Sequence, residues 1–474
     1  MKKILIYLLP MMLLASCVDS LDDYNIDQKN PQAVPAGALF ANATKVLVDN
    51  QTSPSVNVNV FRFFVQHWTT TTYTDEPQYD VFTRNIPLNY WAPFYREVLT
   101  DLKEARRLVE ADEELTEGER NNAVAATEIL SIYTWSVLVN TWGDVPYTEA
   151  LDIQNGEPAY DDAATIYSDL LTRLDNAIGM ITPSESIFGE YDLVYGDDAG
   201  AWLKFAHSLK LRLGITLADV DEATARAAIE SSANQAFTSS ADNAAFQYQG
   251  ETPNNNPVSN NLNPLFTARQ DYVAASTIVD VMNSLDDPRL PFYFTTVNGA
   301  YRGGMQGTTN QYSAFSHISE KVIAPDFEAL LIDYSEVEFI LAEAAARWGI
   351  LGSPIEHYNR AVTASIEYWG GTTAQANAYL ANPAVNYLTA PGDFREKIGT
   401  QKWLALYNRG YDAWVEWRRL DYPELEPAVG AISDIPVRFT YVTNEYTLNQ
   451  ANVEAAAAAI GGDEVTTKVF WDVR

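Results

Sequence analysis

The sequence predicts a mainly α-helical protein, folded as one large globular domain with long loops and few short strands. Apolar residues recur at helical spacing in several long segments. Hydrophobic residues make up 47% of the chain and aromatic residues 12%, which is typical of a globular protein with a large core. No Pro/Gly/Ser-rich linker divides the 474 residues, although that length would allow two or three domains.

The N-terminus indicates secretion and lipidation. Residues 1–16 combine a basic start with a short apolar stretch, which is typical of a secretory signal and too short to span a bilayer. The segment ends in Leu-Ala-Ser before Cys17, the only cysteine of the chain, and this resembles the lipobox of bacterial lipoproteins. The alternative is an ordinary signal peptide with a cysteine nearby by chance. We expect a covalent lipid on Cys17 and no other cofactor.

Residues 17–35 are expected to tether this lipid to a domain that spans residues 36–474. The acidic run after the cysteine resembles the stretch that marks surface-exposed lipoproteins of the Bacteroidetes. A solvated linker in an acidic protein is the alternative. The acidic run consists of Asp19, Asp22 and Asp23. We expect a lipid-anchored protein on the outer membrane that faces the exterior.

Paired helices are predicted along the domain. Residues 123–142 are apolar nearly all round, which predicts a centrally buried helix. An apolar stripe over residues 166–181 predicts another helix. Residues 335–369 predict a hairpin, in which a capping box from Ser335 to Glu338 opens the first helix and Pro354 the second. The hairpin over residues 336–369 has the 34-residue period of tetratricopeptide repeats, and residues 94–142 and 162–217 resemble looser versions.

The remaining segments predict few strands. Strand-like runs occur at residues 291–297 and 435–442, and residues 251–264 are expected to form one long loop. The glycine-rich run 299–307 lacks the Lys-Ser/Thr pair of a phosphate loop, so we expect a tight surface loop there.

Composition and motifs exclude several functions. A formal net charge of −32 repels phosphate backbones, so we expect no nucleic-acid partner. The four histidines lie far apart without an H-E-x-x-H motif, and there is no GxSxG elbow or cysteine nucleophile. We therefore expect no catalytic residues and no metal site.

Four stretches together resemble the SusD/RagB-like nutrient-binding lipoproteins of the Bacteroidetes outer membrane. They are WGDVPYTEA at residues 142–150, NSLDDPRL at 283–290, the tryptophan-rich segment 401–419 and the tail 435–463. The compact tail is similar to the shorter SusD-like branch. The resemblance implies a helical fold with tetratricopeptide-like hairpins and a loop-rich half that carries the ligand face. It also implies a non-catalytic protein that caps a SusC-like TonB-dependent transporter and delivers glycans or peptides to it.

Two of these stretches also have structural explanations. The DPRL turn is expected to hold a salt bridge from Arg289. The tryptophans of the third stretch lie at helical spacing, so we expect them in the core, and the neighbouring arginines should pair with a glutamate. The residues concerned in the third stretch are Trp403, Trp414, Trp417, Glu416, Arg418 and Arg419.

Aromatic residues in polar loops are the candidate ligand contacts, because sugar faces stack on exposed rings and sugar hydroxyls bond to amide, carboxylate or guanidinium groups. Residues 66–79 and 299–312 have this composition. Burial of these rings under long loops is the alternative for each. The candidates are Trp68, Tyr73, Tyr79, Tyr301, Arg302 and Tyr312.

Two other functions stay open from the sequence. A surface-anchored glycan hydrolase would need two opposed carboxylates across a cleft. A structural tetratricopeptide lipoprotein that scaffolds an envelope complex would need neither a glycan nor a peptide ligand.

Overall fold

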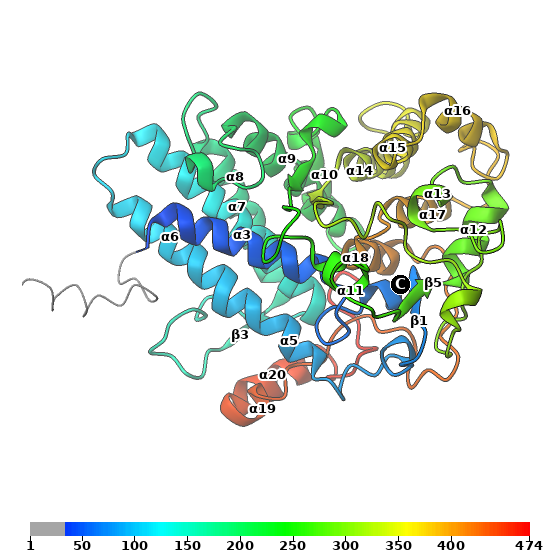
Figure 1. Cartoon of the computed structure of the whole chain (residues 1–474). Helices are drawn as coiled ribbons and strands as arrows, with labels where there is room; N and C mark the ends of the chain where they lie inside the picture. The colour runs from blue at the N-terminus through cyan, green and yellow to red at the C-terminus, as the bar shows by residue number, and fades with distance from the viewer. Residues whose placement is uncertain (1–33) are drawn as a thin grey trace, which may run out of the picture.

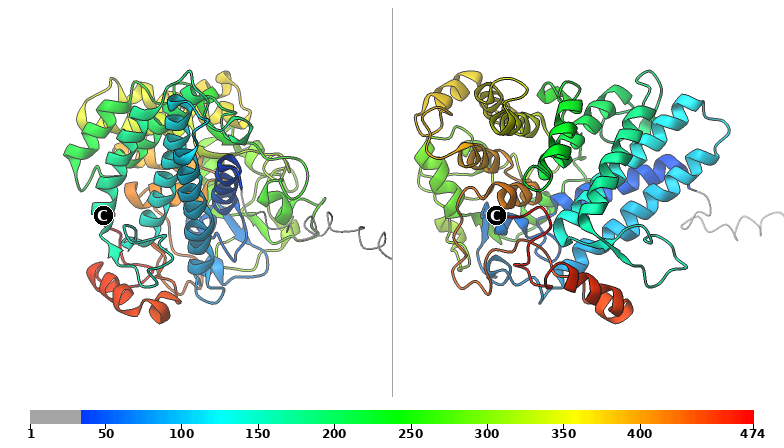
Figure 2. Two further views of the ribbon diagram at one scale, coloured as in Figure 1. Left: turned by 90° about the vertical axis from the view of Figure 1, so that its left-hand side faces the viewer. Right: turned by 180° about the vertical axis from the view of Figure 1, so that it is seen from behind.

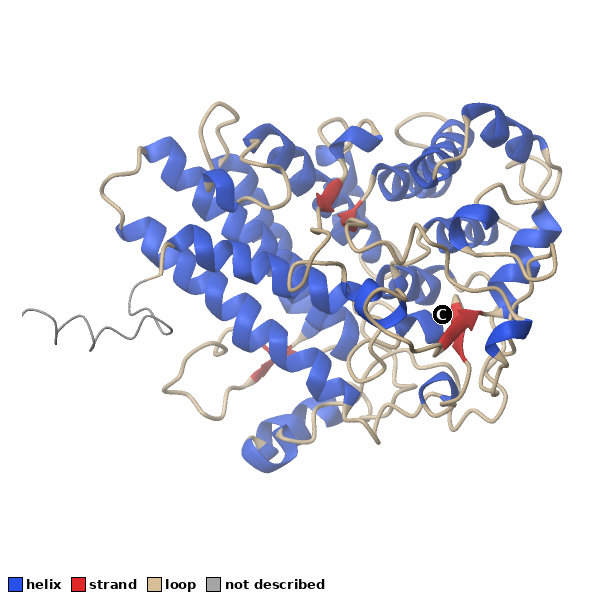
Figure 3. Cartoon of the chain, viewed as in Figure 1, coloured by secondary structure: helices blue, strands red, loops and turns tan. Residues whose placement is uncertain are grey.

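A computed structural model describes residues 34–474. The predicted signal segment, Cys17 and nearly all of the predicted tether lie outside the described residues. Helices dominate the described part of the chain, and strands occur as short pieces (Figure 3). The predicted mainly helical fold is therefore confirmed.

Long helices from the first half of the chain pack side by side on the left of Figure 1. The continuous helical run α5 (Ile86–Pro93), the π-helical segment Phe94–Leu99 and α6 (Thr100–Ala111) lies against α3 (Ala36–Thr52). In chain order α7 (Glu117–Trp142), α8 (Ala163–Met180), α9 (Ala199–Thr216) and α10 (Glu222–Ser232) each pack on the helix before. The helix pairs predicted within residues 94–142 and 162–217 are α6–α7 and α8–α9.

Helix α7 is the centre of this layer. Nearly all of it from Asn122 onward is buried, as its all-round apolar pattern predicts. Among the described residues it is also the helix long and apolar enough to cross a membrane, but 89% of that apolar stretch is buried inside the protein. Its hydrophobic surface is thus used for core packing.

The predicted helix hairpin at residues 336–369 consists of α14 (Tyr334–Trp348) and α15 (Pro354–Trp369). The predicted capping box is wrong by two residues, because Asp333 rather than Ser335 is the N-cap and accepts from the Glu336 amide at 2.9 Å. The hydroxyl of Ser335 instead donates to the Ala361 carbonyl on α15 at 2.8 Å. Gly349 ends α14 in the left-handed conformation, where glycine is favoured.

The tryptophan-rich stretch forms α17 (Phe394–Ala405) and α18 (Gly410–Leu420), which pack on one another. Trp403 and Trp414 are buried, as expected of core residues, whereas Trp417 is partly exposed. The predicted ion pair forms at Arg419, whose Nη2 lies 2.6 Å from Glu416.

Arg418 departs from this expectation. Its guanidinium lies over the Trp414 ring at 3.5 Å and donates to the Asn140 carbonyl at 2.9 Å, with no carboxylate within salt-bridge distance among the described residues. Burial lowers its pKa to about 10. The short separation from Glu416 in the sequence does not bring the two groups together, because side chains two positions apart on a helix do not face each other.

The other half of the molecule is rich in loops and lies on the right of Figure 1 and, seen from behind, on the left of the right-hand view of Figure 2. Its strands form antiparallel pairs, in which β1 (Trp68–Thr70) pairs with β5 (Tyr272–Ala274) and β4 (Ala244–Phe246) with β6 (Ala329–Ile332). A third pair, β2 (Val145–Pro146) with β3 (Tyr160–Asp161), follows α7. The remaining short helices are α4 (Phe61–Phe64), α11 (Pro257–Leu262), α12 (Ser276–Leu285), α13 (Leu290–Tyr293), α16 (Thr373–Ala381), α19 (Glu445–Leu448) and α20 (Gln450–Ala459).

Three local predictions are corrected here. The run 291–297 begins as helix α13, because Pro at its second position favours a helix start, and it forms only isolated bridges beyond. No strand occurs at 435–442, where buried residues pack in an extended loop. The long loop 251–264 contains α11, capped by the Asn256 side chain.

The DPRL turn is confirmed. Asp287 and Arg289 form a fully buried pair in which Nη2 lies 2.5 Å from Oδ2. The same guanidinium also donates to the Ser365 hydroxyl of α15 at 3.0 Å. The turn after α12 is thereby fixed to the repeat-like hairpin.

Candidate functional site

Three segments far apart in the chain interlock in the loop-rich half, and we call their shared surface the three-loop face. They are residues 66–85, 299–317 and 426–434. The side chain of Gln78 connects all three, since its Nε2 donates to the carbonyls of Gly307 at 2.7 Å and Val429 at 3.2 Å. The backbone of Gln78 also accepts from the Ile432 amide at 3.0 Å.

Asn310 holds the second segment against β1. Its buried Nδ2 donates to the carbonyls of Thr70 at 2.9 Å and Met305 at 3.0 Å, and its Oδ1 accepts from the Met305 amide at 2.9 Å. Its own amide donates to the Thr71 carbonyl at 3.0 Å. Buried polar groups satisfied in this way rigidify a loop that has little regular secondary structure.

The glycines of the run 299–307 explain how closely these segments approach. A Cβ on Gly303 would lie 2.3 Å from the Ser276 Cα, and one on Gly307 would lie 2.3 Å from the Val429 carbonyl oxygen. Gly307 also has φ +80°, which favours glycine. The run is therefore a packed structural loop.

The first predicted segment is divided between exposed and buried rings. Tyr73 is 51% exposed, and the Arg84 guanidinium lies 5.9 Å from the centre of its ring. Its carbonyl accepts a hydrogen bond from the Thr70 hydroxyl, which fixes the turn after β1. Tyr73 therefore offers an aromatic surface to solvent.

The expectation that Trp68 and Tyr79 are exposed is wrong. Trp68 pairs through β1 with β5, and its Nε1 donates to the Tyr407 hydroxyl at 3.1 Å in the core. Tyr79 is fully buried, and its hydroxyl accepts from the Ala428 amide at 2.9 Å. Both rings support the three-loop face from beneath, because pairing with distant segments covers them.

The second predicted segment presents partly exposed groups. Tyr312 stacks on His317 with ring centres 3.7 Å apart and planes at 11°, so one ring face is held by the imidazole. The chain around Arg302 pairs with Ser316, whose amide donates to the Arg302 carbonyl at 2.7 Å. Arg302 itself is exposed, without a carboxylate within salt-bridge distance in the part of the chain that the structure describes.

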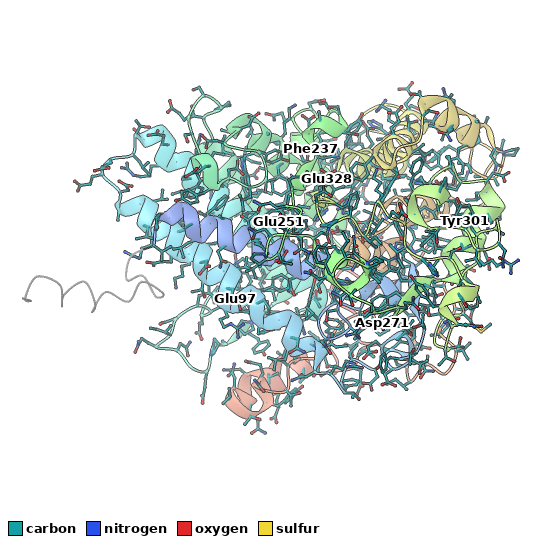
Figure 4. All side chains as sticks on the ribbon, in the orientation of Figure 1. Glu97, Phe237, Glu251, Asp271, Tyr301 and Glu328 are labelled. Carbon is teal, nitrogen blue, oxygen red and sulfur yellow. The ribbon has the colours of Figure 1, made fainter. Side chains whose placement is uncertain are left out.

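Tyr301 lies at the right-hand margin of Figure 4, and it is partly buried beside α12. Its carbonyl accepts a long hydrogen bond from Asn283 Nδ2 at 3.4 Å. Partial burial raises the pKa of both Tyr301 and Tyr312, so each keeps a neutral hydroxyl at neutral pH. The structure thus places Tyr73, Tyr301, Arg302 and Tyr312 at least partly on the surface of the loop-rich half.

Sequence reasoning missed several apolar residues on the same loops. Met305 is 56% exposed and Ile432 is 62% exposed, and Phe82 and Val429 are exposed to a similar degree. They gave no periodic signal, because they lie in short irregular segments outside the helices and strands. Their proximity depends on the contacts of Gln78 across the three segments.

The arrangement suits binding rather than covalent chemistry. Exposed aromatic rings, an exposed guanidinium and loop amides can stack on and hydrogen-bond to a polyhydroxylated ligand. Among the described residues no group of three or more His, Cys, Asp or Glu side chains could hold a metal ion.

Comparison with known proteins identifies relatives over almost the whole chain. A model of a SusD-like family, described as starch-binding and associating with the outer membrane, matches residues 28–442. No curated protein matches.

Solved structures show the same fold. A chitin-binding protein is 25% identical with a TM-score of 0.81, covering 93% of this chain and 100% of that one. A SusD homologue from Bacteroides uniformis is 25% identical with a TM-score of 0.76, and a chitin-binding SusD homologue from Flavobacterium johnsoniae is 22% identical with a TM-score of 0.76. Each of these two alignments covers 92% of this chain and 99% of the other.

Proposed function

Because this chain belongs to the SusD-like family of starch-binding proteins that associate with the outer membrane, we propose that it binds nutrient oligomers on the three-loop face and passes them to a SusC-like TonB-dependent transporter. Members of this family are binding proteins rather than enzymes. The hydrolase function that the sequence left open is therefore not pursued.

The observation that carries the proposal is the Tyr312–His317 stack. One face of the tyrosine ring is covered by the imidazole, and the ring remains partly exposed. A ring held in this way loses little side-chain entropy when a sugar ring stacks on it. Tyr73 and Tyr301 add further aromatic surface on loops that Asn310 and Gln78 hold in place.

A glycan is the first choice of ligand. The family description names starch, and a 25% identical relative is named a chitin-binding protein. A peptide is the second choice, because exposed Met305, Val429 and Ile432 on the same loops would suit apolar side chains.

The proposed anchor is a lipid on Cys17, with residues up to about 35 as the tether. A tethered binding protein stays at high effective concentration over its partner without a strong contact. Durable anchoring needs more than one acyl chain, which a lipoprotein-type cysteine would supply.

Titration calorimetry of residues 18–474 with starch and chitin oligosaccharides tests the binding proposal. Losing one stacking ring costs about 1 kcal/mol, so Tyr312→Ala should weaken binding by a factor of about five. Leu448→Ala, which removes a 65% exposed side chain on α19, should leave the affinity unchanged. Equal affinities for the wild type and Tyr312→Ala would overturn the site, and failure of every glycan and peptide to bind would favour the scaffold function.

A further inference from the structure

A pocket of about 190 Å³ lies between α12, α15, α17 and the loop that joins α16 to α17. Helices α12 and α17 stand above β1 and β5 on the right of Figure 1. The residues that line the pocket lie outside segments 66–85, 299–317 and 426–434, so the pocket is separate from the three-loop face. Sites for drug-sized ligands commonly measure about 300–1,000 Å³, so this pocket suits a smaller molecule.

The walls of the pocket are apolar and reach solvent. Helix α12 contributes Val281 and Leu285, which are one helical turn apart and partly exposed. The loop between α16 and α17 adds Ala384, Ala390 and Pro391, of which the first and the last are exposed. An apolar side chain that enters between these walls would therefore remove apolar surface from water.

The floor of the pocket is held by buried hydrogen bonds. The Tyr358 hydroxyl of α15 donates to the Val385 carbonyl at 2.7 Å, which fixes the loop to the helix. Gln401 of α17 is buried, and its Nε2 donates to the Tyr379 hydroxyl at 2.9 Å. Its Oε1 accepts from Arg289 Nη2 at 3.2 Å. The pocket is thus a preformed part of the fold, as small-molecule sites usually are.

Two opposite charges line the pocket without a partner. In the part of the chain that the structure describes, neither the Lys397 ammonium nor the Glu396 carboxylate has a salt bridge or a side-chain hydrogen bond. Both side chains are partly exposed, and the Lys397 Nζ lies 5.4 Å from the centre of the Tyr387 ring. The neighbouring Arg395 is paired, with Asp393 at 3.3 Å. One positive and one negative group are therefore available to a ligand at the same place.

Thr400 supplies a further polar group. Several threonines inside helices donate to the carbonyl four residues earlier, as Thr134 and Thr141 of α7 do at 2.8 and 2.6 Å. Thr400 lines the pocket from α17, and its hydroxyl makes no hydrogen bond to another described residue. The pocket therefore offers a cation, an anion and a hydroxyl beside apolar walls.

We propose that this pocket binds a free α-amino acid with an apolar side chain, with its carboxylate on Lys397 and its ammonium on Glu396. The side chain of the ligand lies between the apolar walls. A molecule with both charges next to an apolar group matches all of these features. A peptide carries its two terminal charges on different residues, and a neutral sugar uses neither charge and sets its hydroxyls against apolar walls. The site is independent of the proposed nutrient binding.

Ligand-observed NMR titration of residues 18–474 with L-leucine and three analogues tests each part of the proposal. L-Leucine methyl ester lacks the carboxylate, N-acetyl-L-leucine lacks the ammonium, and glycine lacks the apolar side chain. Each analogue should bind at least about fivefold more weakly than L-leucine, because each lacks one of the groups that the pocket matches.

Two substitutions on α17 assign the charges. Lys397→Met should weaken L-leucine about fivefold and leave the methyl ester unchanged, because the ester has no carboxylate for the lysine to bind. Glu396→Gln should weaken L-leucine by a similar factor and leave N-acetyl-L-leucine unchanged. Lys103→Met makes the matching change on α6, outside the pocket, and should not alter any of these affinities.

No saturable binding of L-leucine at about 10 mM, or equal affinities for L-leucine and its analogues, would overturn the proposal. The assigned contacts would be overturned if Lys397→Met weakened L-leucine and its methyl ester by the same factor. Tighter binding of the peptide Gly-Leu-Gly than of L-leucine would assign the pocket to peptides and overturn the proposed amino acid. None of these results depends on the three-loop face, so a failure here leaves the proposed nutrient binding unaffected.

Discussion

Replacing His67 with phenylalanine removes one buried titrating group. The contribution of that group to the pH dependence of stability can then be measured apart from all the others. His67 is fully buried and packs against the rings of Trp403 and Tyr407 at 5.1 and 5.7 Å. Neither ring nitrogen has a hydrogen-bond partner among the described residues. Burial and the nearby Arg62 lower the pKa of His67 to about 3, so the folded protein holds a neutral imidazole.

The sign of the pH dependence of the stability follows from the lowered pKa of His67. In the unfolded chain a histidine has a pKa of about 6.5, so the unfolded state binds the proton first as the pH falls. The stability that neutral His67 contributes is complete above pH 6.5 and is lost progressively toward pH 3. Between pH 6.5 and pH 5 the loss amounts to about 2 kcal/mol, from 1.4 kcal/mol per pH unit.

Thermal unfolding of the wild type and His67→Phe at several pH values between 8 and 5 measures this loss. With an unfolding entropy of about 2.1 cal/mol/K per residue over roughly 440 residues, 2 kcal/mol corresponds to a Tm change of about 2 °C. The wild type should lose that much more than His67→Phe between pH 7.5 and pH 5. Changed packing shifts the variant's Tm equally at all pH values, and parallel curves would refute the reasoning.

Three further tests of the packing described above use substitutions read out by Tm or by hydrogen exchange. Arg289→Met leaves the buried Asp287 carboxylate unpaired and should cost about 3–5 kcal/mol, while adding Asp287→Asn should recover part of it; a neutral single variant would contradict this. Asn310→Ala should speed exchange of amides 303–310, and unchanged exchange would show that the loop is held otherwise. Gly303→Ala should lower the Tm by forcing the loop off α12, whereas Gly179→Ala in α8, with open space around it, should raise it slightly.

The helices could be predicted because their signals are local. Apolar spacing predicted the end of α7 and the bounds of α8, α14 and α15 to within a few residues, and Pro354 predicted the start of α15, whereas α7 begins six residues before its predicted apolar segment. The start of α14 was misplaced because Asp333 and Ser335 are both good N-caps, and a tertiary contact decided between them. The Ser335 hydroxyl donates to the Ala361 carbonyl of the neighbouring helix α15. No local sequence pattern predicts this contact between distant residues.

The exposure of the candidate ligand residues could be predicted only in part, because it depends on contacts between distant segments. Trp68 and Tyr79 share the polar loop context of Tyr73, yet pairing with β5 and with residues near 428 buries them. Met305 and Ile432 join the same face through Gln78, whose partner Gly307 is 229 positions away in the chain. Composition selected the candidate loops, and the fold decided which of their rings reach solvent.

Hydrogen exchange of residues 18–474 with and without a saturating starch or chitin oligosaccharide tests the central claim most directly. If the three-loop face binds the ligand, amides in residues 70–80 and 299–317 should exchange more slowly in the complex, and the helices α6 to α8 should be unchanged. Protection confined to α6–α8, or absent from both loops while the glycan is bound, would contradict the account.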